Sequence, residues 1–180
     1  MSVVPFYRLS GNGNDFLALV EPAHAPGAET IRAVCRRGLS LGADGLFTLE
    51  REDGAVRMRY WNADGGVAAL CLNGTRCAAR LARELGWCDD GLELRTDAGP
   101  VRADFPGRDW VRLELPVPTA PSRSLVLDTP DGPCSVHALT VGVPHVVVEV
   151  GQSLAQFDLA RIGPVLRHHE AFAPEGTNVD

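Results

Sequence analysis

The sequence of 180 residues contains no lysine, and all 17 of its basic side chains are arginine. A chain without a lysine amine cannot form the Schiff base of a lysine-dependent aldolase or the internal aldimine of a pyridoxal phosphate enzyme. It also cannot supply the lysine of a phosphate-binding P-loop. These three kinds of chemistry are therefore excluded for this chain.

Long apolar runs and long runs of like charge are also missing. The apolar stretch around residues 146–148 is far too short to span a membrane, and residues 1–9 lack the regions of a signal peptide. The net charge of -6 is spread along the chain, which argues against an arm that binds nucleic acid or a membrane surface. We therefore expect a cytoplasmic globular protein with a small-molecule partner, no nucleic acid and no membrane.

The five cysteines are an odd number in a chain large enough to form its own core, so a disulfide framework is not expected. Their spacing lacks the short pairs of structural zinc sites, and no metal is expected. Cys35, Cys77 and Cys88 have apolar helical or post-helical neighbours, which predict packed thiols. Cys134 lies in a Gly-Pro-Cys-Ser turn and has no predicted role.

Apolar periodicity indicates many short strands and few helices. Strand-like runs, several of them with strict alternation, predict half-buried antiparallel strands at residues 16–20, 46–50, 56–61, 92–96, 101–105 and 110–115. Helices are predicted at 29–37 and 73–85, the second being alanine-rich, ended by Gly86 and narrow enough for burial inside a curved sheet.

Three prolines between residues 115 and 124 predict a connector, which divides the chain into domains at 1–116 and 117–180. The second region repeats the pattern, with strands at 125–128, 136–141 and 145–150 and a helix at 159–168. The chain ends at residues 178–180, where a further strand begins.

The run Gly11-Asn12-Gly13-Asn14 begins like a dinucleotide-binding fingerprint. Phe16 replaces the third glycine, however, and a strand follows instead of a helix, so this interpretation is rejected. What remains is a turn that presents Asn14, whose amide either closes its own turn or binds a ligand.

Cys71 immediately precedes the predicted helix at 73–85. A thiol there meets the free N–H groups and the positive end of the helix dipole, which stabilise a thiolate. Such a thiolate suits either nucleophilic attack or removal of a carbon-bound proton. The spacing of the sequence does not place any histidine next to Cys71. His145, at a strand start, either reaches into a cleft or is a surface residue.

Several motifs in this order and spacing resemble the diaminopimelate epimerase family over essentially the whole chain. They are Gly11 to Phe16, Gly42-Ala43-Asp44-Gly45, Tyr60-Trp61-Asn62-Ala63-Asp64-Gly65, Cys71-Leu72-Asn73-Gly74-Thr75-Arg76-Cys77, Gly142-Val143-Pro144-His145, Ile162-Gly163-Pro164-Val165-Leu166 and Gly176-Thr177-Asn178-Val179. The resemblance implies an α+β fold of two similar domains, each a mixed, curled β-sheet around a central helix.

The resemblance also implies an enzyme that interconverts L,L- and meso-diaminopimelate without a cofactor, for lysine and peptidoglycan precursors. Two cysteines would flank the substrate α-carbon, with Cys71 as one base and His145 in support. The positions that match substrate-binding residues are Asn14, Asn62, the Leu72 backbone, Asn73, Gly74 and Asn178.

Three departures from the family pattern keep alternatives open. Leu72 replaces a glycine, Val143 replaces a substrate-binding asparagine, and Gly45 matches a position that is glutamine in some members. The chain also ends before the family's second catalytic cysteine, so we expect an incomplete form. The alternatives are an epimerase portion, a racemase of another amino acid and a non-catalytic remnant that binds a ligand; a homodimer also stays open.

Overall fold

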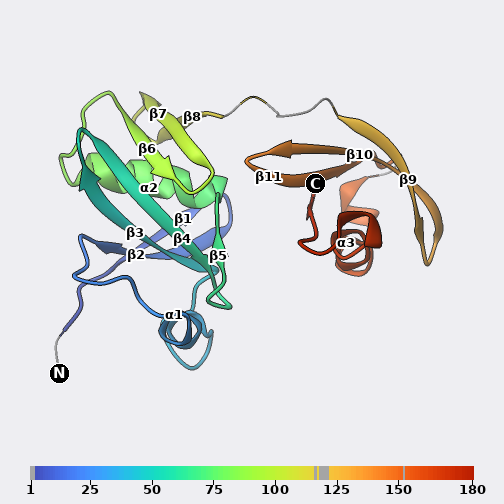
Figure 1. Ribbon diagram of the computed structural model, residues 1–180, viewed down its shortest axis with the longest axis horizontal. Coiled ribbons are helices and arrows are strands. Elements are labelled where there is room, and N and C mark those ends of the chain that lie inside the picture. Colours follow the sequence, from blue (N-terminus) through green and yellow to red (C-terminus); the bar gives the residue numbers. More distant parts are fainter. Residues whose placement is uncertain (1–2, 116, 118–121, 152) are drawn as a thin grey trace. The chain divides into compact units, whose positions relative to one another are not determined.

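The computed structural model describes residues 3–115, 117, 122–151 and 153–180 (Figure 1). The chain divides into two compact units, Met1–Leu115 and Pro116–Asp180. Among the residues that the structure describes, no helix combines the length and the apolar character that crossing a membrane requires.

The first unit is built on one mixed sheet with the strand order β1-β2-β3-β4-β6-β7-β8, in which β5 also pairs with β4. Its strands are β1 (Tyr7–Gly11), β2 (Asn14–Val20), β3 (Gly45–Glu52), β4 (Ala55–Asn62), β5 (Val67–Ala68), β6 (Gly91–Thr96), β7 (Gly99–Gly107) and β8 (Trp110–Glu114). The six strands predicted for this region are confirmed, whereas β1 and β5 were not predicted.

Strand alternation predicted antiparallel pairing, which is wrong at two places, whereas the mixed sheet that the resemblance implied is confirmed. Strands β2 and β3 pair in parallel, and so do β4 and β6. Parallel neighbours require a crossover connection, and a helix lies in each one: α1 (Ala28–Cys35) between β2 and β3, and α2 (Leu72–Glu84) between β4 and β6. The two helices thus account for the mixed pairing of the sheet.

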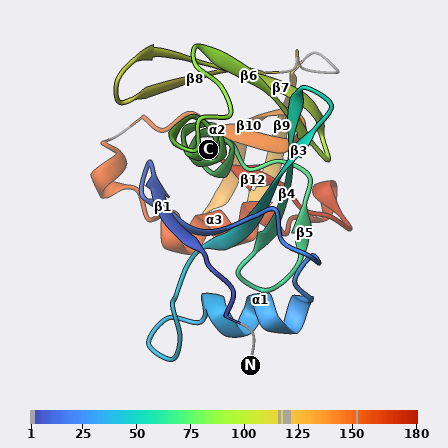
Figure 2. The same cartoon turned by 90° about the vertical axis from the view of Figure 1, so that its left-hand side faces the viewer.

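Helix α2 lies within the curve of this sheet and contacts β1, β2, β3, β4, β6 and β8 (Figure 2). Ala78, Ala79 and Ala82 have no exposed surface, so their small side chains let the helix approach the strands. Gly86, at φ 72°, ends the helix, and the Trp87 N–H donates to the Ala82 carbonyl. The predicted buried helix and its glycine stop are confirmed.

The other face of the sheet is covered by α1. Ile31 and Cys35 of this helix pack against Leu17, Leu46 and Trp61 of β2, β3 and β4. Central strands covered on both faces lose their alternation, which explains why consecutive residues of β2 and β3 are buried.

The second unit has a sheet of the order β12-β11-β10-β9, with β12 parallel to β11. Its helix α3 (Leu159–Arg167) packs through Ile162 and Leu166 onto the sheet. The remaining elements are β9 (Arg123–Thr129), β10 (Gly132–Val141), β11 (Val143–Val148), β12 (Asn178–Val179) and the 3₁₀ turns η1 (Leu154–Gln156) and η2 (Glu170–Phe172). The predicted strands and helix of this region are confirmed, with ends shifted by up to four residues.

Candidate functional site

Cys71 is the N-cap residue of α2, as the sequence predicted. Its backbone is extended, and its sulfur accepts a hydrogen bond from the Gly74 N–H at 3.4 Å. Its carbonyl accepts from the Thr75 N–H at 2.7 Å and from the Thr75 hydroxyl at 2.9 Å. The sulfur is thus fixed beside the first turn of the helix, where N–H groups concentrate positive charge.

The N–H groups of Leu72 and Asn73 belong to the same first turn. The helix has no carbonyl four residues before either of them, so neither N–H makes the usual hydrogen bond within the helix. Free N–H groups at a helix start bind carboxylates and phosphates. The turn therefore offers two donors for an anion next to a thiol that is itself half-buried.

Tyr60 of β4 lies beside Cys71 and was not predicted as a site residue. Burial above all, followed by the proximity of Cys71, raises the pKa of the Tyr60 hydroxyl. The hydroxyl therefore stays protonated and can donate a hydrogen bond to the sulfur. A Cβ atom on Gly45 would lie 2.5 Å from the Tyr60 oxygen, so this glycine leaves the space that the tyrosine occupies.

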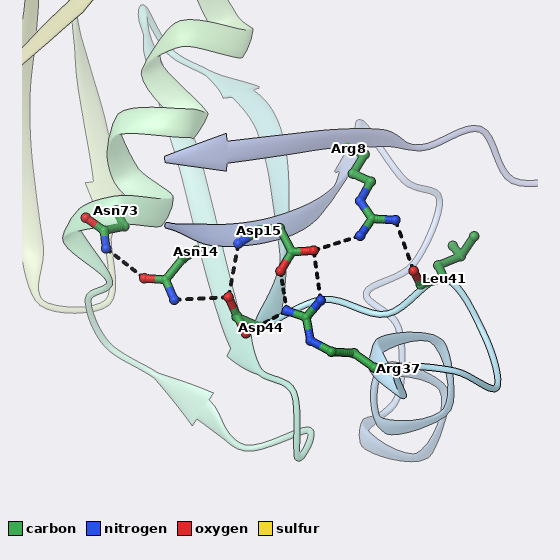
Figure 3. A network of polar contacts seen from close by, with 7 residues as sticks. All are labelled: Arg8, Asn14, Asp15, Arg37, Leu41, Asp44 and Asn73. Carbon is green, nitrogen blue, oxygen red and sulfur yellow. Dashed lines mark hydrogen bonds and ion pairs between the residues drawn. The ribbon is translucent and has the colours of Figure 1, made fainter. Parts of the chain in front are cut away.

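Four polar side chains from three segments form a continuous hydrogen-bonded chain, here named the amide relay: Arg76, Asn73, Asn14 and Asp44 (Figure 3 shows the last three). Nη2 of Arg76 donates to Oδ1 of Asn73. Nδ2 of Asn73 donates to Oδ1 of Asn14 at 2.7 Å, and Nδ2 of Asn14 donates to Oδ2 of Asp44 at 3.0 Å. Two of the predicted substrate-binding residues, Asn14 and Asn73, are thereby in direct contact.

A cluster of ion pairs surrounds the Asp44 end of the relay (Figure 3). Arg37 donates to Asp44 at 2.8 Å and also binds Asp15, while Arg8 binds Asp15 at 2.7 Å and the Leu41 carbonyl at 3.0 Å. The hydrogen bond from Arg37, and then that from Arg8, hold the pKa of Asp15 well below its usual range. Both carboxylates are therefore charged at neutral pH.

The other predicted residue of the first unit, Asn62, ends β4 and is exposed. It pairs with Gly45 across the sheet, and its N–H donates to the Gly66 carbonyl at 2.9 Å. Gly74, in contrast, is buried within α2 and contributes through its N–H.

His145 and Asn178 belong to the second unit, where they are opposite each other in the parallel pair β11–β12. Nδ1 of His145 lies 2.8 Å from Oδ2 of Asp180, a partner that the sequence did not predict. With Thr140 and Thr177, among others, His145 lines a cavity of about 310 Å³. A carboxylate on one ring nitrogen orients the imidazole and leaves the other nitrogen for a ligand.

The remaining cysteines have the settings of packed thiols. Cys35 and Cys77 are buried, which confirms the prediction for them, and burial raises the pKa of Cys77 to about 11. Burial also raises the pKa of the half-buried Cys88, and Cys134 packs against the core of the second unit. In the part of the chain that the structure describes, no group of three or more His, Cys, Asp or Glu could hold a metal ion.

Comparisons with known proteins identify a family for the chain. The family described as Diaminopimelate epimerase matches residues 6–111. Proteins named diaminopimelate epimerase from Hydrogenobaculum sp. (strain Y04AAS1) and Chlorobaculum tepidum are 32% and 36% identical to the chain. These matches cover 96% of the chain in both cases, and 68% and 67% of the two relatives.

Solved structures share the fold at low sequence identity. A probable proline racemase from Agrobacterium radiobacter K84 has a TM-score of 0.62 at 18% identity, over 89% of this chain and 53% of that protein. A hydroxyproline epimerase from Agrobacterium vitis has a TM-score of 0.61 at 15% identity, over 91% and 55%. The chain thus spans about two thirds of the length of its curated relatives and just over half of these structural neighbours. The neighbours establish the α+β fold with its curled mixed sheet.

Proposed function

Because the chain belongs to the diaminopimelate epimerase family, we propose that it serves the cofactor-independent interconversion of L,L- and meso-diaminopimelate, a step toward lysine and peptidoglycan precursors. Cys71 is one of two groups that exchange a proton with the α-carbon. The observation that carries this proposal is the half-buried Cys71 sulfur at the first turn of α2, beside two free N–H groups.

The reaction explains why a thiol and free N–H groups belong together. When the Cys71 thiolate takes the α-proton, it becomes a thiol, and the electron pair of the broken C–H bond stays on the substrate next to its carboxylate. Without a cofactor to accept this charge, fixed donors must stabilise it more strongly than they stabilise the substrate. The N–H groups of Leu72 and Asn73 are suited to this task because they need no rearrangement.

Inversion requires a second proton donor on the opposite face of the α-carbon. A proton delivered from that face inverts the configuration of the α-carbon, while the composition and the connectivity of the substrate stay the same. His145, whose ring Asp180 orients, is assigned a supporting role in which it tunes the acid–base pair and is not itself the second base. The polar ends of the substrate are bound by Asn14, Asn62, Asn73 and Asn178. Residues 1–116 and 117–180 form the two domains of the enzyme.

A second candidate function is racemisation of another amino acid on the same fold. The contact between Gly45 and Tyr60 favours it, because a longer side chain at residue 45 would collide with the phenol. Leu72 at the helix start further changes the shape of the space around the thiol. Both candidates share Cys71 as the base and differ in the substrate.

Ligand protection of Cys71 separates these functions. We expect L,L-diaminopimelate to slow the alkylation of Cys71 by iodoacetamide, read by peptide mass, and to leave the alkylation of Cys88 unchanged. The single-ended amino acid L-lysine is the matched control ligand, because it lacks the second carboxylate. Protection by other amino acids but not by diaminopimelate supports the second candidate, and labelling that no amino acid slows contradicts both.

A further inference from the structure

We propose that Arg76 and Asp44 are positioning residues, which fix the direction of the amide relay and so decide which atoms of Asn14 and Asn73 donate and which accept. The inference deepens the proposed function and rests on it, since these amides are its proposed substrate contacts. It assigns roles to two residues that touch the amides from opposite ends.

The direction follows from the chemistry of the two ends. A guanidinium only donates hydrogen bonds, and an ionised carboxylate only accepts them. With Arg76 against Asn73 and Asp44 against Asn14, each amide has one orientation that satisfies its neighbours. Reversal of both amides would put an amide oxygen against the carboxylate and an amide nitrogen against the guanidinium.

The Asp44 end is rigid and charged. Its Oδ2 also accepts the Asp15 N–H at 3.0 Å, its own N–H donates to the Asp15 carbonyl at 2.8 Å, and its carbonyl accepts the Ala63 N–H at 3.1 Å. The hydrogen bond from Asn14, reinforced by Arg37, keeps the pKa of Asp44 below its usual value. The relay therefore ends on an acceptor that neither rotates nor takes up a proton at neutral pH.

A fixed direction gives the amides the means to distinguish substrate groups. After their bonds within the relay, Asn14 and Asn73 each retain one N–H and one oxygen lone pair at defined positions. A substrate carboxylate needs the N–H, whereas a substrate ammonium needs the lone pair. An amide free to turn over would accept either group, and its selectivity would be lost.

The direct test substitutes a residue at one end of the amide relay and measures the hydrogen exchange of the amide protons at the other end. We would measure the hydrogen exchange of side-chain amide protons by ¹⁵N NMR in the wild type, Asp44→Asn and Asp15→Asn. Asp15→Asn is the matched control, because it removes an adjacent carboxylate that binds arginines but no amide of the relay. We expect Asp44→Asn to speed exchange at Nδ2 of Asn73, which Asp44 does not bond, about tenfold, with no such change in Asp15→Asn.

Unchanged hydrogen exchange at Asn73 in a folded Asp44→Asn variant would overturn the proposal that Asp44 fixes the direction of the amide relay. If that variant does not fold, the opposite end provides the test: Arg76→Met should speed exchange at Nδ2 of Asn14, and Arg76→Gln, which still donates, should restore it. Equal exchange in the two Arg76 variants would equally overturn the proposal.

The exchange measurement needs no substrate, so its failure counts against the relay alone. With diaminopimelate, we expect Asp44→Asn to raise the KM about tenfold and Asp15→Asn to change it less than about twofold. Equal KM values in the two variants would contradict the role in selectivity. An intact relay in a protein that does not act on diaminopimelate would count against the proposed function and not against the relay.

Discussion

Replacement of Ala78 by leucine tests the burial of α2 within the sheet. Ala78 has no exposed surface and belongs to the core cluster of the first unit. Leucine adds three carbon atoms where strands surround the helix, and such overpacking typically costs about 1–3 kcal/mol. If the free energy of unfolding falls by about 2 kcal/mol and the m value is about 2 kcal/mol per M, the urea midpoint should fall by about 1 M.

Tryptophan fluorescence isolates this effect, because all three tryptophans, Trp61, Trp87 and Trp110, lie in the first unit. The matched control is Ala33→Leu, which makes the same change at an exposed position of α1. We expect this control to change the free energy of unfolding by less than about 0.5 kcal/mol. A midpoint for Ala78→Leu equal to that of the control would refute the enclosure of α2.

Two further predictions concern ionisable groups. Because Arg37, and then Arg8, lower the pKa of folded Asp15, its contribution to stability is present above the unfolded pKa of about 3.9 and is lost as the pH falls further. The urea midpoint of the wild type should exceed that of Asp15→Asn at neutral pH and approach it below about pH 4; a constant difference would contradict the ion pairs. Because burial and Cys71 raise the pKa of Tyr60, the Tyr60→Phe substitution should leave the tyrosinate absorbance of the native protein at about pH 11 unchanged. Loss of absorbance in that variant would show that Tyr60 had ionised.

Local signals made α2 predictable. Its apolar residues recur at helical spacing and Gly86 supplies the stop, so both its burial and the N-cap position of Cys71 follow from consecutive residues. The hairpin between β1 and β2 also has a local signal that was missed. Asn12 at φ 50° and Gly13 at φ 90° form its two-residue turn, and Asn-Gly is strongly preferred in turns of this kind.

Contacts between distant segments were not predictable in the same way. Asn14 bonds Asp44 and Asn73 across 30 and 59 residues of sequence. These contacts depend on the parallel pairing of β2 with β3 and on the placement of α2, neither of which strand alternation specifies. Asp44 lay within a recognised motif, yet only the fold reveals that its carboxylate binds Asn14.

In the proposed reaction, Cys71 removes the α-proton of the substrate. The most direct test of this step is deuterium incorporation at the α-carbon of L,L- and meso-diaminopimelate in deuterated water, with the wild type, Cys71→Ser and Cys88→Ser. We expect incorporation by the wild type and by Cys88→Ser and its loss in a folded Cys71→Ser variant. Incorporation that persists in Cys71→Ser, or that is absent from the folded wild type, would contradict this step.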